Sequence, residues 1–330
     1  MSKTSRRLKA DKRNRNPSQP AETPHGAKMA VPPRITLLAM LGVGLGIAYM
    51  SRRKRPKRPL LNKDTQICIS LAKRPSNIGT RFHNYLYEEL GIDFIYKACT
   101  TSDIKAAIGG VRALGLRGCS VSMPFKEAVI ALVDEMDASA LAIQSVNTIV
   151  NTGGTLRAYN TDYGAIVALI ASHGLRSSES VAIRGSGGMA KAVGAAFRDA
   201  GFMKGTVIAR NTTSGPALAA ELGYVWTASV DGIAAEILVN VTPIGMAGSP
   251  EESEIAFRDD AIERARVIFD VVAFPSETPL VRRARAFGKA LVTGAEVIAL
   301  QAAKQFELYT GVQPTKEQVL RASVFSRSCP

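Results

Sequence analysis

The sequence is poor in the residues that build disulfide frameworks and metal sites. It has four cysteines in 330 residues (Cys68, Cys99, Cys119 and Cys329), none in a C-x-x-C pair, and three histidines, none paired at metal-ligand spacing. These absences exclude a disulfide scaffold and a zinc ribbon, suit a reducing compartment, and predict no metal. No internal repeat is evident. The balance of 46% hydrophobic and 21% charged residues excludes collagen-like, wholly disordered and polytopic membrane proteins.

The net charge of +14 is confined to one end of the chain. Residues 1–60 carry 15 lysines and arginines against two acids, while the other 270 residues carry 27 basic and 26 acidic side chains. The body of the protein is therefore nearly neutral. Its charge gives no electrostatic reason to expect nucleic acid as its main ligand.

The basic extension combines a polar segment over residues 1–30 with an apolar run over residues 35–50 and a basic cluster at residues 52–58. The apolar run has 16 residues, whereas a membrane span normally needs about 20. A signal peptide carries its charge before the apolar run, not after it. Three interpretations stay open: a tail that is disordered or helical, or is not part of the native protein; a membrane tether through residues 35–50; and an arm that binds nucleic acid or anionic lipid.

From residue 66 onward, short apolar runs alternate with amphipathic segments that end at glycine, as strands alternate with helices. The strands are expected at 66–71, 94–98, 118–122, 146–150, 181–184, 206–209, 237–241 and 267–272. The helices are expected at 82–90, 103–114 (capped by Ser102), 127–135, 162–170, 191–200, 216–222 and 295–310. This order predicts an α/β protein with mainly parallel sheets.

A glycine-rich loop lies between the strand at 181–184 and the helix after it. Its sequence, G-S-G-G-M-A, fits the dinucleotide pattern G-x-G-x-x-A. Gly185 allows the tight turn, Gly187 lets the backbone approach a pyrophosphate, and Ala190 permits close packing of helix on sheet. The helix N-terminus then offers N–H groups to phosphate. We therefore assign the cofactor loop to Gly185, Ser186, Gly187, Gly188, Met189 and Ala190. The alternative is a glycine-rich turn without a ligand.

The end of the following strand indicates which dinucleotide binds. An NAD site places Asp or Glu there for the ribose 2′-hydroxyl, but this strand ends in Ala209-Arg210-Asn211. No carboxylate repels a 2′-phosphate, and Arg210 can pair with one. The expected cofactor is therefore NADP, with a solvated loop arginine as the alternative role of Arg210.

Six motifs in order resemble the shikimate dehydrogenase family. They are S-V-S-M-P-F-K at 120–126, S-V-N-T at 145–148, N-T-D at 160–162, the glycine loop, N-V-T-P-I-G-M at 240–246, and the segment from Gly294 to Gly311. The resemblance covers residues 66–311, nearly the whole body. It implies an N-terminal α/β substrate domain joined to a Rossmann-type NADP domain.

The resemblance assigns Lys126 and Asp162 as the catalytic pair, which binds the reacting hydroxyl and moves its proton. The chemistry is reasonable in itself, because a carboxylate can orient an ammonium that shuttles a proton. A structural ion pair is the alternative. The resemblance also places Ser122, Asn147 and Gln301 against the substrate. It adds Asn211, Thr242 and Met246 to the cofactor site.

The part of the pattern that holds the substrate carboxylate departs from the family. The two family serines before His-Asn are replaced by Asn77 and Gly79, and the family tyrosine of D-x-x-Y is replaced by Ala273. Ser76 and Thr80 lie one residue away and can serve only if the loop is reshaped. The chain therefore resembles a shikimate dehydrogenase-like branch, and we expect weak activity on shikimate. A basic side chain beside the loop, such as Arg81, is a candidate replacement for the lost hydroxyls.

These interpretations combine into one expected organisation. The domains are the extension (1–60), a substrate domain (61–165 and 292–330) and an NADP domain (166–291). The expected reaction interconverts a hydroxyl and a ketone on shikimate or a related cyclic hydroxy acid. A quinate or other polyol-acid dehydrogenase and a non-catalytic NADP-binding regulatory protein are the alternatives. We expect a cytoplasmic monomer or homodimer with a small-molecule partner.

Overall fold

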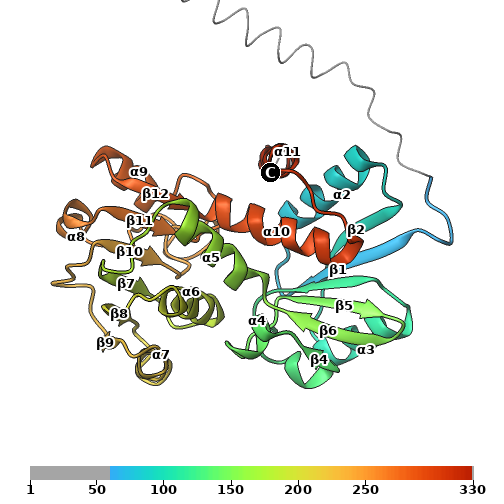
Figure 1. Cartoon of the computed structure of the whole chain (residues 1–330), viewed down its shortest axis with the longest axis horizontal. Coiled ribbons are helices and arrows are strands. Elements are labelled where there is room, and N and C mark those ends of the chain that lie inside the picture. Colours follow the sequence, from blue (N-terminus) through green and yellow to red (C-terminus); the bar gives the residue numbers. More distant parts are fainter. Residues whose placement is uncertain (1–59, 329–330) are drawn as a thin grey trace, which may run out of the picture. The chain divides into compact units, whose positions relative to one another are not determined.

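The computed structural model describes residues 60–328, so the extension expected over residues 1–60 lies outside it except for Leu60. The described chain forms two six-stranded sheets, with strand orders β2-β1-β3-β5-β6-β4 and β12-β11-β10-β7-β8-β9 (Figure 1). Helices alternate with the strands along the chain. The expected α/β class is therefore confirmed.

The first sheet is mixed. β1 runs parallel to β2 and β3, whereas β5 is antiparallel to both β3 and β6. Ser70, Ser120 and Thr148 occupy one register level across β1, β3 and β5. The strands are β1 (Gln66–Ala72), β2 (Phe94–Thr100), β3 (Gly118–Val121), β4 (Glu135–Met136), β5 (Thr148–Thr152) and β6 (Thr155–Tyr159).

Two helices cover the first sheet where the sequence predicts them, with different boundaries. Helix α2 (Ile78–Leu90) begins four residues earlier than expected and ends at Gly91, whose φ of 67° suits glycine. Helix α3 (Ile104–Ala113) is capped by Asp103, which accepts a hydrogen bond from the Ala106 N–H. The expected cap, Ser102, is thus wrong by one residue, and both residue types cap helices well.

The helix expected over residues 127–135 is wrong. That segment forms turns and a short 3₁₀ helix, η1 (Ile130–Leu132), before it enters β4. Glu135 pairs in register with Arg157 of β6, a strand that the sequence pattern did not reveal. Strand pairing therefore takes only the last residue of the expected helix, and turns take the rest. The short helix α4 (Ala138–Leu141) follows.

The second sheet is parallel throughout. Its strands are β7 (Val181–Arg184), β8 (Gly205–Ile208), β9 (Val225–Thr227), β10 (Ile237–Asn240), β11 (Val267–Asp270) and β12 (Ala290–Thr293). Its helices are α5 (Thr161–Ser172), α6 (Gly188–Asp199), α7 (Ser214–Leu222), α8 (Asp259–Arg264) and α9 (Pro279–Ala286). Strand alternation separates the cores: Val181 and Ile183 join one cluster, and Ala182 joins another with residues of α8 and α9.

The chain returns to the first sheet through its last two helices. Helix α10 (Gly294–Thr310) starts directly after β12, and it contacts α5, β5 and α2. Helix α11 (Lys316–Arg327) packs against α2. Strand β12 crosses the predicted boundary at residue 291, and the division into domains stays a prediction.

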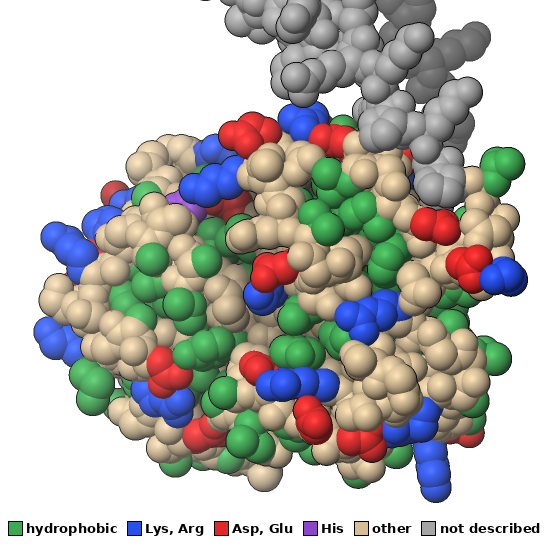
Figure 2. Space-filling model, turned by 45° about the vertical axis from the view of Figure 1, so that its right-hand side comes forward, with side chains coloured by type: hydrophobic (Ala, Val, Ile, Leu, Met, Phe, Trp, Pro, Cys, Tyr) green, Lys and Arg blue, Asp and Glu red, His purple; other side chains and the backbone are tan. Residues whose placement is uncertain are grey.

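Two further observations concern the surface and the helices. Acidic and basic side chains are interspersed over the face shown in Figure 2, in keeping with the balanced charge of the body. Among residues 60–328, no helix is both long and apolar enough to cross a membrane. The apolar run at residues 35–50 lies outside the described residues.

Candidate active site

The structure brings Lys126 and Asp162 together. Lys126 follows β3, and its Nζ lies 2.5 Å from Oδ2 of Asp162 in the first turn of α5. The Asn160 side chain caps this helix by accepting from the N–H groups of Asp162 and Tyr163. A helix N-terminus favours a carboxylate at this position. The Asp162 side chain is 3% exposed and that of Lys126 is 17% exposed, so the lysine is the member that a ligand can reach.

Beside this pair, two buried polar groups have no hydrogen-bond partner within the described chain. Oδ1 of Asn147 accepts from the Thr161 N–H at 2.9 Å and the Thr148 hydroxyl at 2.8 Å, but Nδ2 has no partner. The Ser145 hydroxyl is also buried and unpartnered. Buried polar groups are costly unless they bind something. The orphaned amide of Asn147 therefore fits its predicted contact with a substrate hydroxyl.

Helix α10 supplies the glutamine side of the site. Gln305 donates to Oγ1 of Thr148 at 2.9 Å, and Gln301 lies one turn earlier on the same helix face. Gln301 thus shares the helix face of Gln305, which contacts the first residue of β5, directly after Asn147. The sequence interpretation missed the supporting residues Thr148 and Gln305. Their signals were the threonine after Asn147 and the i, i+4 spacing from Gln301.

The glycine loop lies next to Lys126. A Cβ atom on Gly188 would lie 3.4 Å from Oγ of Ser145 and 3.8 Å from Cδ of Lys126. Gly185 has a φ of 129°, and a side chain there would collide with Val241, so this position requires glycine. The space around Gly187 is open, which leaves room for a ligand against the backbone. Ala190 is fully buried in the core beneath the loop.

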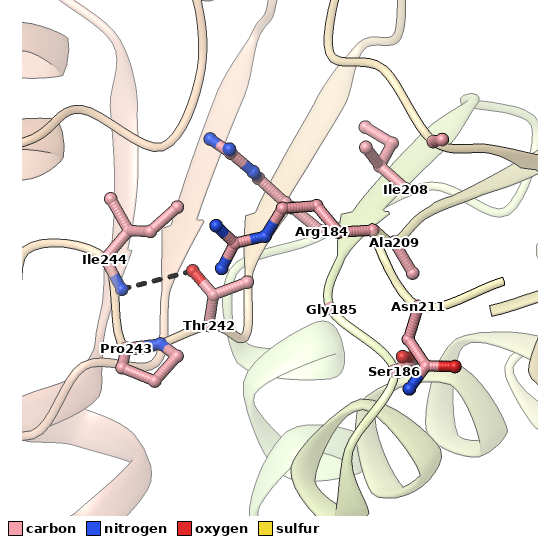
Figure 3. Close-up of a pocket in the computed structure, with 11 residues that line it drawn as sticks. Arg184, Gly185, Ser186, Ile208, Ala209, Asn211, Thr242, Pro243 and Ile244 are labelled. Atoms are coloured by element: carbon pink, nitrogen blue, oxygen red, sulfur yellow. Dashed lines mark hydrogen bonds between the residues drawn. The ribbon is translucent and has the colours of Figure 1, made fainter. Parts of the chain in front are cut away.

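A cavity of about 230 Å³ opens beyond the carboxyl ends of β7, β8 and β10 (Figure 3). Parallel sheets bind ligands at this edge. Its lining includes the predicted cofactor residues Gly185, Ser186, Arg210, Asn211 and Thr242. The other predicted cofactor residues, Gly187, Gly188, Met189, Ala190 and Met246, are not part of its lining.

Hydrogen bonds hold the lining of this cavity in place. The Thr242 hydroxyl donates to Oδ1 of Asn240 at 2.6 Å and accepts from the Ile244 N–H, the bond drawn in Figure 3. Oδ1 of Asn211 accepts from two backbone N–H groups at the start of α7. Arg210 pairs with Glu251 through two nitrogens, at 3.0 and 3.4 Å. The cavity, the open loop and the arginine fit a phosphorylated dinucleotide.

The hydroxyl groups expected at the substrate carboxylate differ in whether the protein already uses them. Ser76 and Ser122 are exposed, whereas Oγ1 of Thr80 accepts from the Ala98 N–H at 3.1 Å and so joins α2 to β2. A Cβ atom on Gly79 would lie 3.7 Å from the Tyr96 hydroxyl. That hydroxyl is in turn bonded to the Ser120 hydroxyl at 2.6 Å.

The rest of the D-x-x-Y segment has a structural role. Asp270 is buried and accepts from Asn240 at 3.0 Å and from Thr278 at 2.6 Å, so it ties β11 to β10 and to the start of α9. Burial raises the pKa of this carboxyl, against the effect of its hydrogen bonds. In the described chain, no cluster of three His, Cys, Asp or Glu side chains is arranged to hold a metal ion.

Comparison of the sequence with known proteins identifies relatives of two kinds. Residues 77–149 match the model of the shikimate dehydrogenase substrate binding domain. The chain is 57% identical over 269 residues to a shikimate dehydrogenase-like protein of Haemophilus influenzae, covering 82% of this chain and 99% of that protein. It is 32% identical to the NADP⁺ shikimate dehydrogenase of Halothermothrix orenii, covering 72% of this chain and 88% of the relative.

Solved structures agree with these relatives. A shikimate 5-dehydrogenase-like protein superposes with a TM-score of 0.77 at 57% identity, over 82% of this chain and all of the other. The Thermus thermophilus shikimate 5-dehydrogenase in complex with NADP(H) and shikimate gives 0.72 at 27% identity, over 79% and 99%. Quinate dehydrogenase of Corynebacterium glutamicum with NAD gives 0.73 at 26%, over 80% and 99%. The two-domain Rossmann-type fold is thereby confirmed, and the chain belongs to the shikimate dehydrogenase family, in its shikimate dehydrogenase-like branch.

Proposed function

We propose that this protein is an NADP-dependent dehydrogenase that interconverts a hydroxyl and a ketone on a cyclic hydroxy acid related to shikimate. The observation that carries the proposal is the Lys126–Asp162 pair, 2.5 Å apart and next to Gly188 of the glycine loop. This position suits proton transfer, because a dinucleotide held by the glycine loop would lie next to the pair.

The pair has a defined task in each direction of the reaction. When the ketone is reduced, the Lys126 ammonium donates a proton to the oxygen that becomes the hydroxyl, and Asp162 holds the ammonium in position. When the hydroxyl is oxidised, the proton returns to the pair. Asn147 and Gln301 orient the ring through its other hydroxyls, since the Nδ2 group of Asn147 is buried and has no partner within residues 60–328.

The cofactor site extends from the glycine loop to the cavity of Figure 3. NADP, when bound, carries the hydride. Gly187 and the N-terminus of α6 would hold the pyrophosphate, and Arg210 with Asn211 would hold the 2′-phosphate. Met246 lies after β10, in the segment assigned to the nicotinamide end of the site.

The acid end of the substrate site supports a substrate that differs from shikimate. Two hydroxyl donors are lost at Asn77 and Gly79, and a tyrosine at Ala273. A lost hydrogen bond to a charged group costs about 1.5–3 kcal/mol. Quinate or another polyol acid is the second candidate, favoured by the structural similarity to a quinate dehydrogenase.

The test is a rate measurement on the full chain with shikimate, then quinate, followed by the absorbance of NADPH. Lys126→Met and Asp162→Asn are the variants. Turnover that disappears in both variants, while NADPH binding persists, supports the proposal. A wild-type protein that binds NADPH and turns over neither these acids nor a panel of cyclic hydroxy acids favours the non-catalytic alternative.

A further inference from the structure

A second arginine lines the cavity of Figure 3. Besides Arg210, the lining includes Arg184, the last residue of β7, which precedes the glycine loop. The dinucleotide pattern begins at Gly185 and assigns no role to the residue before it. Arg184 therefore stands at the cofactor cavity as a cation that the sequence motifs do not explain.

The sheet fixes where this side chain points. Arg184 lies in register with Ile208 of β8 and Asn240 of β10, and it shares the strand face of Ala182. It is half-buried, and its guanidinium donates to the carbonyl oxygen of Ala256. A guanidinium has five N–H donors in a rigid fork, so one bond to a carbonyl fixes the side chain and leaves donors for a ligand in the cavity.

The charges around the cavity favour a dianion. Burial lowers the pKa of Arg184, and the positive charge of Arg210 lowers it further, while Glu251 and Glu254 act in the opposite direction. Two cations beside one cavity repel each other unless an anion lies between them. Glu251 supplies a carboxylate to Arg210, whose side chain is 74% exposed. The Glu251 side chain is 23% exposed. An ion pair whose arginine lies in solvent stabilises little, so a phosphate dianion can displace the carboxylate from Arg210.

We propose that Arg184 acts with Arg210 as a specificity residue for the 2′-phosphate of NADP. In the absence of cofactor, the Glu251 carboxylate occupies the place of this phosphate beside Arg210. The proposal rests on the cofactor assignment of the proposed function. It concerns binding alone, so it can be tested without turnover.

The experiment is calorimetric binding of adenosine 2′,5′-bisphosphate and adenosine 5′-monophosphate, which differ by the 2′-phosphate alone. Arg184→Met is expected to lower the affinity for the bisphosphate by about 10- to 100-fold, the range of a lost charged hydrogen bond, and to leave the monophosphate unaffected. Glu251→Gln is expected to raise the affinity for the bisphosphate by about two- to fivefold. Arg285→Met, which removes an exposed charge from α9 outside the cavity lining, is the matched control and should change neither.

Several outcomes would overturn the proposal. Equal losses for both ligands would mean that Arg184 contacts the adenosine. An unchanged bisphosphate affinity in folded Arg184→Met would remove its role altogether. If Arg184→Met does not fold, the test uses Arg184→Lys and Glu251→Gln. Arg184→Lys keeps the positive charge but loses the planar fork of N–H donors. It should therefore weaken binding of the bisphosphate and leave binding of the monophosphate unchanged. A wild-type protein that binds both ligands equally would refute the cofactor assignment instead.

Discussion

The two ends of the substrate site differ in how far they keep the family pattern. At the hydride end, Lys126 and Asp162 lie 2.5 Å apart beside the glycine loop, and Asn147 presents an unpartnered amide. At the acid end, Asn77 and Gly79 replace the hydroxyl donors. Proton transfer depends on a geometry that few residues can satisfy, whereas an acid can be held by several kinds of side chain. Under the proposed function, this difference would place the chemistry and the choice of substrate in separate parts of the site.

The largest effect is expected at the hydride end. Lys126→Met removes the proposed proton donor and should lower kcat by about 10²- to 10⁴-fold, the usual contribution of general acid–base catalysis. Asp162→Asn should cause a loss of the same order. Steady-state kinetics measures the loss, and NADPH titration is the control, because neither residue lines the nucleotide cavity. A kcat within tenfold of wild type would assign the pair a structural role.

The next effect should come from restoring the acid end. Gly79 is not in a left-handed conformation, and a Cβ atom there makes ordinary contact with Tyr96 at 3.7 Å, so Asn77→Ser/Gly79→Ser should fold. The two hydroxyls should raise kcat/KM for shikimate by about 10- to 100-fold. The control is Asn77→Ala/Gly79→Ala, which makes a similar change of shape without adding hydroxyl groups. If both double variants change kcat/KM equally, the added hydroxyls do not hold the substrate acid.

A third effect concerns the core beneath the acid end. His83 is fully buried and stacks on Tyr96 with ring centroids 4.3 Å apart, and burial lowers its pKa to about 3 from 6.5. Between these pH values the unfolded chain binds the proton and the folded chain does not, so stability falls as the pH drops from 6.5 toward 3. The free energy of unfolding should fall by about 2 kcal/mol more between pH 7 and 5 than in His83→Phe. Urea denaturation at several pH values measures the free energy of unfolding of both proteins. The same dependence on pH in wild type and His83→Phe would contradict the prediction.

The smallest effect is expected from the basic side chain beside the reshaped loop. Arg81 lies in the first turn of α2 and is half-buried. If it contacts the substrate acid, Arg81→Ala should raise KM about three- to tenfold with little change in kcat, because an interaction equal in ground and transition states acts on binding alone. Lys73→Ala, an exposed neighbour of the loop, is the matched control. A KM equal to that of wild type would remove Arg81 from the acid end.

The sequence predicts best where local chemistry decides the structure. The glycine loop between β7 and α6 follows from a short pattern, and the predicted strand starts at Gln66 and Val181 are correct. The resemblance to the family identifies Lys126 and Asp162, which the structure brings together. Asp162 is identified from the N-T-D motif, and in the structure Asn160 of the same motif caps its helix.

The sequence predicts less well where distant residues decide. Residues 127–135 have a helical pattern, but β6 offers an edge that draws Glu135 into a strand. Thr80 has the hydroxyl expected of a substrate contact, yet this hydroxyl accepts a hydrogen bond from the Ala98 N–H of β2. Arg184 lies at the cavity because of the register of β7 with β8 and β10, and because its guanidinium donates to the carbonyl oxygen of Ala256, 72 residues later in the chain. None of these contacts can be inferred from spacing along the sequence.

The return of the chain through α10 has a consequence for synthesis. Phe306 and Tyr309 of this helix complete the core around Phe82 and Tyr87 of α2, with Tyr87 and Phe306 ring centroids 5.2 Å apart. At about 5–20 residues per second, the ribosome makes these two halves on the order of 10–40 s apart. During that interval the aromatic side chains of α2 have no partner from α10. The core beside the first sheet is therefore completed only near the end of synthesis, when α10 supplies Phe306 and Tyr309.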